Sequence, residues 1–490
     1  MKTKLIFYIS CILLMTGFVN GQVWLVDPLE PIYPDINDVS KNAKKWTGDY
    51  PLGAVADVHV LIKLRPGETF TVSAMMEDSL LDHKFLSMLI DVPVEQNTGV
   101  DSRTEQYIGK INPDVVRRAP FRIFEVIEPL MDDKLVTETN FTALRLSIPP
   151  GLIQQAGSKK VTIQIRSGSL NEKVTFIARY HTIELPELAK STFFYTNWFN
   201  LKKMEEEHKL QRWSEDWFDM LDKYARLMAY GRQNSITIPH ELISYENNEI
   251  ALDKEKMIRF INVFRNLGFA YFEAPHLMNR GENDDWGDPE LKVALTKKAY
   301  YQENGKADIE QLMLLIKNFV LANDLKDSWL QHVADEPTSV NAKCYKDVVK
   351  QIKSIYPEIK IMEATNDRDG LTGAIDIWCP LINDFQENEA FFRKREELVE
   401  QVLVYTCLIP GGKWLNRTLD MEKLRQVYFG WGAAFFKTSG YLHWGLNQYQ
   451  GDPFEQSVVH HPAPGAAANN FLPAGDTHII YPGKDKPLSS

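Results

Sequence analysis

Hydrophobic and polar residues follow two different patterns along the chain, and the change lies near residue 190. From about residue 23 to residue 188, short runs alternate apolar and polar residues, with turn signals between them. Such alternation is typical of strands that bury one face. We therefore predict an N-terminal β-sandwich domain over residues 22–188. Its clearest strand-like runs are residues 58–64, 69–72, 143–148, 161–165 and 174–180.

After residue 188, apolar strand-like runs alternate with runs of helical periodicity. The predicted strands are residues 191–197, 235–240, 269–273, 329–334, 360–365, 375–381, 402–408 and 441–446. The predicted helices are residues 214–229, 254–267, 307–323, 342–355, 387–400 and 419–436, and only a weak helix follows the fifth strand. Eight such units over about 260 residues are typical of a (β/α)8 TIM-like barrel, an α/β fold that we predict over residues 189–490. A doubly wound open sheet is the alternative, but it needs a glycine-rich phosphate-binding loop after an early strand, and the sequence has none.

The first 21 residues have the pattern of a secretory signal peptide. Lys2 and Lys4 precede an almost wholly apolar run over residues 5–19, and a cut before Gln22 follows small or tolerated residues. A lipoprotein cut before Cys11 is the weaker alternative, because the apolar run continues beyond that cysteine. No later run approaches the ~20 apolar residues that span a bilayer. We therefore expect a secreted or periplasmic protein with no transmembrane segment.

Composition narrows the class of partner. The 490 residues include 55 Lys and Arg against 66 Asp and Glu, a formal net charge of −11. Nucleic-acid binding depends on a basic surface that neutralises phosphates, so a nucleic-acid partner is not expected. Beyond Cys11 the only cysteines are Cys344, Cys379 and Cys407, without the spacing of a disulfide framework or a zinc site. We expect buried thiols, no metal and no cofactor.

Polar and aromatic residues gather at the predicted strand ends. Active sites of TIM barrels lie at the C-terminal ends of the strands, so these positions are candidates for substrate binding. A single histidine or asparagine at a strand end usually bonds a loop, but their convergence favours a binding site. The candidates are Asn197, His240, Glu273, His276, Asn366, Trp378, Tyr405, His443, Trp444 and Asn447.

The sharpest signal is the pair Asp335-Glu336, which is followed by Pro337 at the end of the fourth predicted strand. Neighbouring side chains on a strand point to opposite faces, so both carboxylates reach one pocket only where the strand ends. Pro337 cannot continue a ladder and should hold Glu336 in an extended conformation. Adjacent carboxylates repel and raise one pKa, as glycosidic cleavage requires. The alternative is a helix cap, in which Asp335 or Thr338 caps the helix at 342.

Two segments carry a resemblance to a known family. Residues 331–337 (QHVADEP) and 440–447 (GYLHWGLN) resemble glycoside hydrolase family 123, whose catalytic domain would cover residues 190–490. Characterised members are retaining β-N-acetylgalactosaminidases that use substrate assistance. The resemblance implies that Asp335 orients the 2-acetamido group of the sugar and that Glu336 is the general acid/base. The expected partner is therefore a glycan with a terminal N-acetylhexosamine.

Several expectations around this site stay open. By their strand-end positions, Trp378, Tyr405 and Trp444 should wall the sugar pocket. The resemblance also implies further chain, with a helical stretch, after residues 481–483. Two alternatives to the leading function are a glycosidase that uses separated carboxylates, such as Glu273 with Glu336, and a non-catalytic glycan-binding protein. The acidic loop 281–286 either contacts substrate or is simply solvated.

Overall fold

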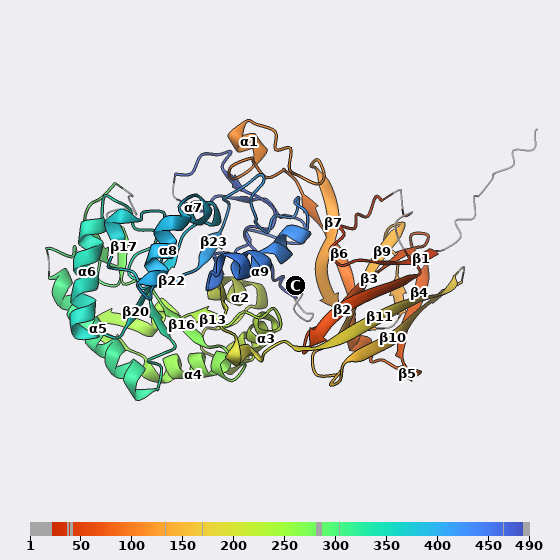
Figure 1. Cartoon of the computed structure of the whole chain (residues 1–490), viewed down its shortest axis with the longest axis horizontal. Helices are drawn as coiled ribbons and strands as arrows, with labels where there is room; N and C mark the ends of the chain where they lie inside the picture. The colour runs from red at the N-terminus through yellow and green to blue at the C-terminus, as the bar shows by residue number, and fades with distance from the viewer. Residues whose placement is uncertain are drawn as a thin grey trace, which may run out of the picture.

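The chain folds into two regions that lie side by side in the computed structural model (Figure 1). The structure describes residues 22–36, 39, 43–132, 134–168, 170–280, 287–302, 304–463 and 465–483. The predicted signal peptide, residues 1–21, and the acidic loop 281–286 lie outside the described residues. No helix in the described part of the chain is both long and apolar enough to cross a membrane.

The N-terminal sheet region consists of two sheets. The first has the order β1 (Gln22–Val26), β3 (Ala56–Lys63), β9 (Phe141–Ile148), β6 (Leu86–Val94) and β7 (Phe121–Pro129). The second has the order β2 (Lys45–Leu52), β11 (Asn171–Glu184), β10 (Gly157–Ser167), β4 (Thr69–Met76) and β5 (Ser79–Leu80), with β8 (Lys134–Val136) also paired to β4. The two sheets share one hydrophobic core, to which β1, β3, β4, β9, β10 and β11 contribute every second residue.

Alternation along β3 shows how the sequence produces this core. Val58, Val60 and Ile62 are fully buried in the cluster, and β10 contributes Val161 and Ile163 from the opposite sheet. Fully burying an aliphatic side chain contributes about 1.5–3 kcal/mol, so the shared core is the main stabilising term of this region. The same alternation predicted the strands from sequence.

The second region alternates strands and helices. Its main strands are β12 (Phe194–Asn197), β13 (Ser235–Thr237), β16 (Tyr271–Ala274), β19 (Trp329–Gln331), β20 (Lys360–Ala364), β21 (Ile377–Cys379), β23 (Val404–Thr406) and β24 (Gly440–His443), and all of their pairings are parallel. The helices are α2 (Leu201–His208), α3 (Glu215–Tyr230), α4 (Lys254–Arg265), α5 (Gly305–Ala322), α6 (Ala342–Ile355), α7 (Ile382–Glu387), α8 (Glu389–Glu397) and α9 (Leu424–Phe436). Each of the eight predicted strands therefore has a parallel strand in the structure, although every one is shorter than predicted.

The parallel strands form two ladders in the described residues. One ladder has the order β12-β24-β23, and the other has the order β13-β16-β19-β20-β21-β22, where β22 is Gln401–Val402. At one junction Leu381 bridges Tyr405, and at the other the Asn234 N–H donates to the Tyr195 carbonyl at 3.1 Å. The fold is thus mixed α/β with a large N-terminal sheet region, and a regular closed barrel stays a prediction.

Three predicted helices differ from the observed ones. The predicted helix 387–400 corresponds to the shorter α8, and a separate helix that was not predicted, α7, precedes it and ends beside Asn388. The predicted helix 419–436 begins only at Leu424, because the residues before it bond to other parts of the chain, as when the Leu419 N–H donates to the Ala474 carbonyl. After β20 there is only a short 3-10 turn, Asp369–Leu371.

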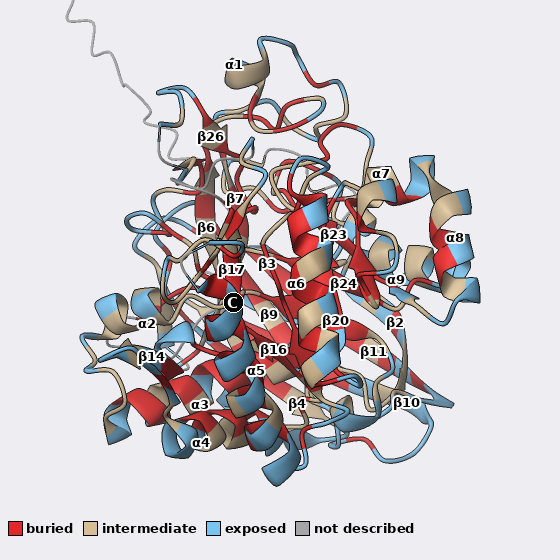
Figure 2. Cartoon of the chain, turned by 90° about the vertical axis from the view of Figure 1, so that its left-hand side faces the viewer, coloured by how far each residue is buried: buried red, intermediate tan, exposed pale blue. Residues whose placement is uncertain are grey.

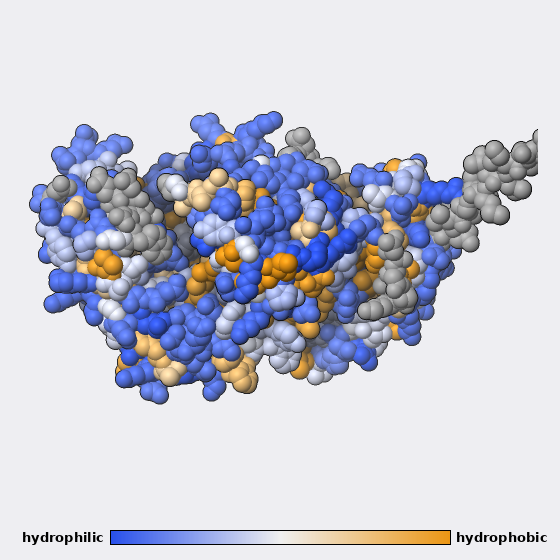
Figure 3. All heavy atoms as spheres, turned by 90° about the horizontal axis from the view of Figure 1, so that it is seen from above, coloured by the Kyte–Doolittle hydropathy of each residue, from blue (hydrophilic) through white to orange (hydrophobic). Residues whose placement is uncertain are grey.

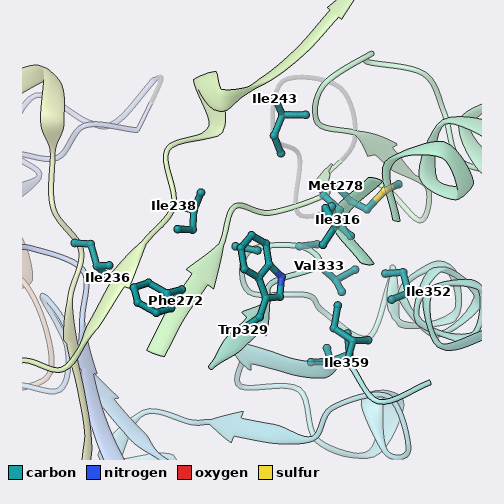
Figure 4. Packing of buried hydrophobic residues seen from close by; sticks show 14 of the residues in the cluster. Ile236, Ile238, Ile243, Phe272, Met278, Ile316, Trp329, Val333, Ile352 and Ile359 are labelled. Carbon is teal, nitrogen blue, oxygen red and sulfur yellow. The ribbon is translucent and has the colours of Figure 1, made fainter. Parts of the chain in front are cut away.

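Two hydrophobic clusters cover the two faces of the parallel strands. The outer cluster packs the strands against the helices, and Figure 4 shows Trp329 of β19 with Phe272 on one side and Ile352 of α6 on the other. The inner cluster lies between the two ladders and consists of Phe194, Leu330, Met362, Ala364, Ile377, Cys379, Leu381, Leu403, Tyr405 and Leu442. Figure 2 shows the strands as buried and the outward faces of α5 and α6 as exposed. Successive residues of a strand point alternately to the inner and the outer cluster.

The outer face of β12 and β24 is incompletely covered. A cavity of about 380 Å³ lies there, lined by Tyr195, Tyr441, Phe429 of α9 and Ile127 of β7. No residue of α9 is buried, and Trp431 is 70% exposed. In the space-filling view, hydrophobic residues gather along the middle of the molecule while hydrophilic ones cover most of the remaining surface (Figure 3). The two regions therefore meet beside a partly open apolar surface.

A buried carboxylate joins the two regions. Asp420, which precedes α9, is 2% exposed and accepts hydrogen bonds from the Thr98 N–H (2.7 Å), the Thr98 hydroxyl (2.7 Å) and the Asn97 side-chain amide (3.1 Å). Close by, a Cβ on Gly411 would lie 2.2 Å from the Gly99 carbonyl oxygen. The loop after β23 and the segment after β6 are therefore in backbone contact, and the sheet region supports that loop.

Replacing Asp420 by Ala should destabilise the protein by about 3 kcal/mol, because buried donors on Asn97 and Thr98 lose a charged acceptor. We expect the Tm in a thermal melt to fall by about 5 °C or more. The control is Glu455→Ala, which removes an ion pair with Arg122 (3.1 Å) between the same two regions but from a side chain that is 68% exposed. Equal and small effects of both substitutions would contradict the role of Asp420.

Candidate active site

Asp335 and Glu336 leave the end of β19 and enter two different environments. The Asp335 side chain is 46% exposed, and its Oδ2 lies 3.8 Å from the guanidinium of Arg280 in β17 (Met278–Arg280). Glu336 is partly buried, and its Oε1 accepts a hydrogen bond from the Tyr405 hydroxyl at 2.7 Å. The pair thus consists of one solvent-facing carboxylate and one carboxyl group held against the strands.

The environment of Glu336 favours its protonated form. Burial raises the pKa of Glu336, and the neighbouring charge of Asp335 raises it further. The hydrogen bond from Tyr405 and the charge of Arg280 oppose the shift, whereas the charge of Glu363 adds to it. The net direction is upward. A carboxyl group with a raised pKa can donate a proton at a pH where an ordinary glutamate is ionised, which is the requirement for a general acid.

The backbone at Glu336 is in the left-handed region, with a φ of +41°. The sequence predicted an extended conformation before Pro337, and this prediction is wrong. A non-glycine residue in this region costs about 1–3 kcal/mol and persists only where the surroundings fix it. After Glu336, the Thr365 hydroxyl donates to the Pro337 carbonyl at 2.9 Å, and the Thr338 N–H donates to Asn341 Oδ1 at 2.9 Å. Neither Asp335 nor Thr338 caps α6, whose N-cap is Asn341.

A network of buried charges lies beside this pair. His332 is 1% exposed, and its Nε2 is 3.2 Å from Glu273 Oε2 while its Nδ1 is 3.4 Å from Glu363 Oε1. Glu273, in β16, is fully buried and also accepts hydrogen bonds from the Ser235 hydroxyl (2.6 Å) and the indole N–H of Trp198 (3.1 Å). A positively charged imidazole between two carboxylates satisfies all three buried groups.

Each member of the network shifts the pKa of the others. Burial alone would lower the pKa of His332, but the hydrogen bonds and charges of Glu273 and Glu363 outweigh it and raise the pKa to about 10. Burial would raise the pKa of Glu363, but His276 and His332 outweigh it and lower the pKa to about 2. The pKa of Glu273 is lowered for the same reason, chiefly by His332 against its burial. The network is therefore ionised at neutral pH.

Trp198 and His276 cover the network on the side of the site. The Trp198 ring meets His276 and His332 edge-on, with 6.1 Å between ring centroids in both pairs. The His276 side chain is 26% exposed, and its Nε2 lies 3.5 Å from Glu363 Oε1. These two rings are the accessible neighbours of the buried charges, so they are candidates for contact with a substrate.

The described residues include one group of side chains with metal-ligand chemistry. Ligand atoms of His276, His332 and Glu363 all lie within 4.8 Å of one another. Both nitrogens of His332, however, face carboxylate oxygens, and the raised pKa of His332 places a proton on each of them. A metal ion binds an imidazole nitrogen that carries no proton, so His332 would have to give up a bond to one of the two carboxylates before this group could hold a metal ion.

Three predicted binding residues lie on the wrong face of their strands. The inner cluster includes Ile377, Cys379 and Leu442. Successive side chains point to opposite faces of a strand, so Trp378 and His443, which are next to these residues, point to the outer face. The Trp378 indole donates to Glu400 at 2.6 Å and packs against the rings of α8, so its prediction as a wall of the sugar pocket is wrong. The third of these residues is Asn197. It lies two residues after Tyr195 on β12, so it faces the outer cluster as Tyr195 does.

Asn197, His443 and Trp444 belong to a buried structural cluster around Arg417. The Arg417 guanidinium donates to Asn197 Oδ1 at 2.8 Å and to the Asp476 carbonyl at 2.7 Å. Trp444 donates to Asp476 Oδ1 at 3.1 Å, and His443 Nε2 lies 3.4 Å from the same oxygen. Burial raises the pKa of Asp476 to about 7 and lowers that of His443 well below its usual value. The polar groups of these side chains therefore contact one another within the cluster.

The other predicted residues divide between structure and surface. Asn447 is fully buried and exchanges two hydrogen bonds with the backbone of Asn200, at 2.8 and 3.0 Å. His240 is 81% exposed and lies 3.5 Å from Glu241. Asn366 is exposed. Of the predicted residues, the structure brings Asp335, Glu336 and Tyr405 together, with Glu273 and His276 in the adjoining network.

The same geometry decides against a mechanism with Glu273 as the second carboxylate. Its side chain is fully buried, and each of its oxygens already accepts a hydrogen bond from Ser235, Trp198 or His332. A nucleophile or base must reach the substrate, and Glu273 cannot do so without losing these bonds. The Asp335 side chain, by contrast, is 46% exposed.

Sequence reasoning missed Arg280, His332 and Glu363. Two of them carried a readable signal, because an ionisable residue inside an otherwise apolar strand must have a buried partner. Glu363 interrupts the apolar strand β20, and His332 follows the apolar strand β19. The spacing gave no indication that the two side chains meet. Arg280 directly precedes the acidic loop and had no such context.

Comparison with known proteins identifies the family. A model of the glycoside hydrolase 123 catalytic domain matches residues 198–490. The chain belongs to glycoside hydrolase family 123. This protein is therefore a glycosidase, and its substrate is a glycan. Among curated protein sequences, none matches the chain.

One solved structure of the family has a similar fold. A family 123 glycoside hydrolase from Clostridium perfringens, described in connection with glycolipid glycan hydrolysis, is similar with a TM-score of 0.70 and 15% identity, covering 96% of this chain and 85% of that one. At this identity the likeness concerns the fold. A putative β-galactosidase from Bacteroides fragilis (TM-score 0.33, 9% identity, 95% and 59% coverage) and a GH10 xylanase from Thermobacillus composti (0.34, 14%, 59% and 92%) are much more distant.

Replacing Tyr405 by Phe should move the alkaline limb of the pH–rate profile to higher pH. The Tyr405 hydroxyl stabilises ionised Glu336, so its loss raises the pKa of Glu336 and keeps the acid protonated to higher pH. The measurement is kcat/KM against pH on an aryl glycoside. The control is Tyr300→Phe, whose hydroxyl bonds Gln351 at 2.9 Å on the outer helices. A shift to lower pH, or the same shift in the control, would contradict the assignment.

Proposed function

We propose that this family 123 enzyme is a retaining exo-glycosidase that removes terminal β-linked N-acetylgalactosamine by substrate-assisted catalysis. The observation that carries the proposal is the adjacent pair with unlike neighbours: the Asp335 side chain is half-exposed beside Arg280, and Glu336 is partly buried and has a raised pKa. The resemblance of residues 331–337 to the family supports the assignment of roles. The Clostridium perfringens relative, by its description, acts on glycolipid glycans, which supports a glycoconjugate substrate.

In the proposed reaction the substrate supplies its own nucleophile. The acetamido oxygen attacks C1 as the bond from C1 to the leaving oxygen breaks, and Glu336 donates its proton to that oxygen. Asp335 accepts a hydrogen bond from the acetamido N–H, which gains positive character as the oxazolinium ion forms, so the bond strengthens in the transition state. Ionised Glu336 then takes a proton from water, which attacks C1 and restores the acetamido group with retention.

We also propose that the parallel strands form a (β/α)8 barrel and that residues 1–21 direct export from the cytoplasm. The strand order and the contacts at both ladder junctions support the barrel. The pair lies beyond the C-terminal end of β19, on the side of the strands that barrels use for catalysis. The basic start and apolar run support export, and N-terminal sequencing of secreted protein would test the cut before Gln22.

The substrate prediction is a strict dependence on the acetamido group. The enzyme should hydrolyse 4-nitrophenyl β-N-acetylgalactosaminide and leave the 4-nitrophenyl β-galactoside intact, because the galactoside lacks the internal nucleophile. The β-N-acetylglucosaminide serves as a test of the sugar's stereochemistry at C4. Release of nitrophenol is the measurement. Cleavage of the plain galactoside at a comparable rate would contradict substrate assistance.

Variants of the pair should show different signatures. Asp335→Asn should lower kcat by about 10²–10³-fold, as loss of an electrostatic partner of the transition state does. Glu336→Gln should lower it by about 10²–10⁴-fold for poor leaving groups and less for 4-nitrophenol, which needs little protonation. The control is Asp369→Asn, an exposed carboxylate after β20. Near-normal activity of Asp335→Asn would contradict its role.

A further inference from the structure

On the side that faces β20, the segment between β19 and the catalytic pair is held by a side chain and not by ladder pairing. The parallel ladder between β19 and β20 ends with the pairing of Gln331 and Ile361. Beyond it, the N–H groups of Val333 and Ala334 both donate to Glu363 Oε2, at 2.9 and 3.1 Å. A single carboxylate oxygen thus replaces the ladder over the two residues that lead into Asp335.

Glu363 is itself fixed from several sides. The Tyr345 hydroxyl of α6 donates to the same Oε2 at 3.0 Å, while Oε1 faces His332 at 3.4 Å and His276 at 3.5 Å. The Glu363 side chain is only 1% exposed. It therefore cannot touch a glycan, and any influence that it has on the reaction must pass through the groups that it holds.

We propose that Glu363 is a positioning residue for the Asp335-Glu336 pair, because its carboxylate holds the Val333 and Ala334 amides on one side and His332 and His276 on the other. This inference rests on the proposed function and deepens it. Glu363 fixes the backbone immediately before the pair, and the bonds with Thr365 and Asn341 fix the backbone after it. The strained backbone at Glu336 is thus held on both sides. Strained residues persist where such bonds surround them.

The charge of Glu363 supports the same role. It is one of the charges that raise the pKa of Glu336. The other charged or titratable groups facing Glu336 are Asp335 from its own segment, Arg280 of β17, and Tyr405 and Cys407 on and after β23. Removing the charge of Glu363 should therefore lower the pKa of Glu336, whereas the other groups remain in place.

The test is Glu363→Gln, which keeps the shape of the side chain and removes its charge. We expect kcat to fall by about 10- to 100-fold with a smaller change in KM, as a displaced catalytic group produces. The alkaline limb of the pH–rate profile should move to lower pH. The matched control is Glu400→Gln, a largely buried carboxylate that accepts the Trp378 indole N–H at 2.6 Å on the outer side of the strands.

A purely structural role would give a different result. Loss of folded protein lowers kcat equally at all pH values and leaves the limb in place. An unmoved limb, together with a kcat equal to that of the control, would overturn the proposal. If Glu363→Gln fails to fold, Tyr345→Phe removes one bond to Glu363 while keeping its charge, and it should lower kcat without moving the limb; a kcat equal to wild type would overturn the proposal.

A titration without substrate separates this inference from the proposed function. The carboxylic acid band of Glu336 in infrared spectra, identified by its absence in Glu336→Gln, should disappear at lower pH in Glu363→Gln than in the wild type. If it does so while no N-acetylgalactosaminide is cleaved, the positioning role stands and the substrate is wrong. If the substrate is cleaved and neither the band nor the limb moves, the positioning role is wrong.

Discussion

The ion network of Glu273, His332 and Glu363 is the constraint on which the arrangement of this site depends. Buried charges are costly unless each one is paired and hydrogen-bonded, and here one imidazolium satisfies carboxylates from two different strands, β16 and β20. The network fixes the relative position of these strands and of the chain that leaves β19 between them. The dipeptide Asp335-Glu336 begins three residues after His332, so its direction follows from the network.

This arrangement explains how two consecutive acidic residues acquire different chemistry. The left-handed turn at Glu336 sends its side chain against Tyr405, while Asp335 remains exposed beside Arg280. Burial and the neighbouring negative charge of Asp335 then raise the pKa of Glu336. Environment, and not residue type, separates the proposed acid from the proposed orienting carboxylate, as is general for acid–base pairs in enzymes.

The sequence was sufficient for the alternation of parallel strands and helices after residue 190, because hydrophobic periodicity carries that information. The parallel strands and the helices α3 to α6 lie close to their predicted ranges. The sequence was insufficient for the rest of the site. Asn197, Trp378 and His443 were chosen as strand-end residues, but the face that each one occupies depends on strand register, which the sequence did not reveal. Glu363 and His332 meet only through tertiary structure, and the left-handed Glu336 contradicts the local preference before proline.

The central claim is that Asp335 binds the acetamido group of the substrate while Glu336 donates a proton to the leaving oxygen. A crystal structure with an N-acetylgalactosamine-derived thiazoline, which imitates the oxazolinium ion, tests this most directly. The account predicts that the ring nitrogen lies within hydrogen-bond distance of the Asp335 carboxylate and that Glu336 faces the leaving-group side of C1. An inhibitor bound with its nitrogen against another residue, or with Asp335 out of reach, would contradict the account.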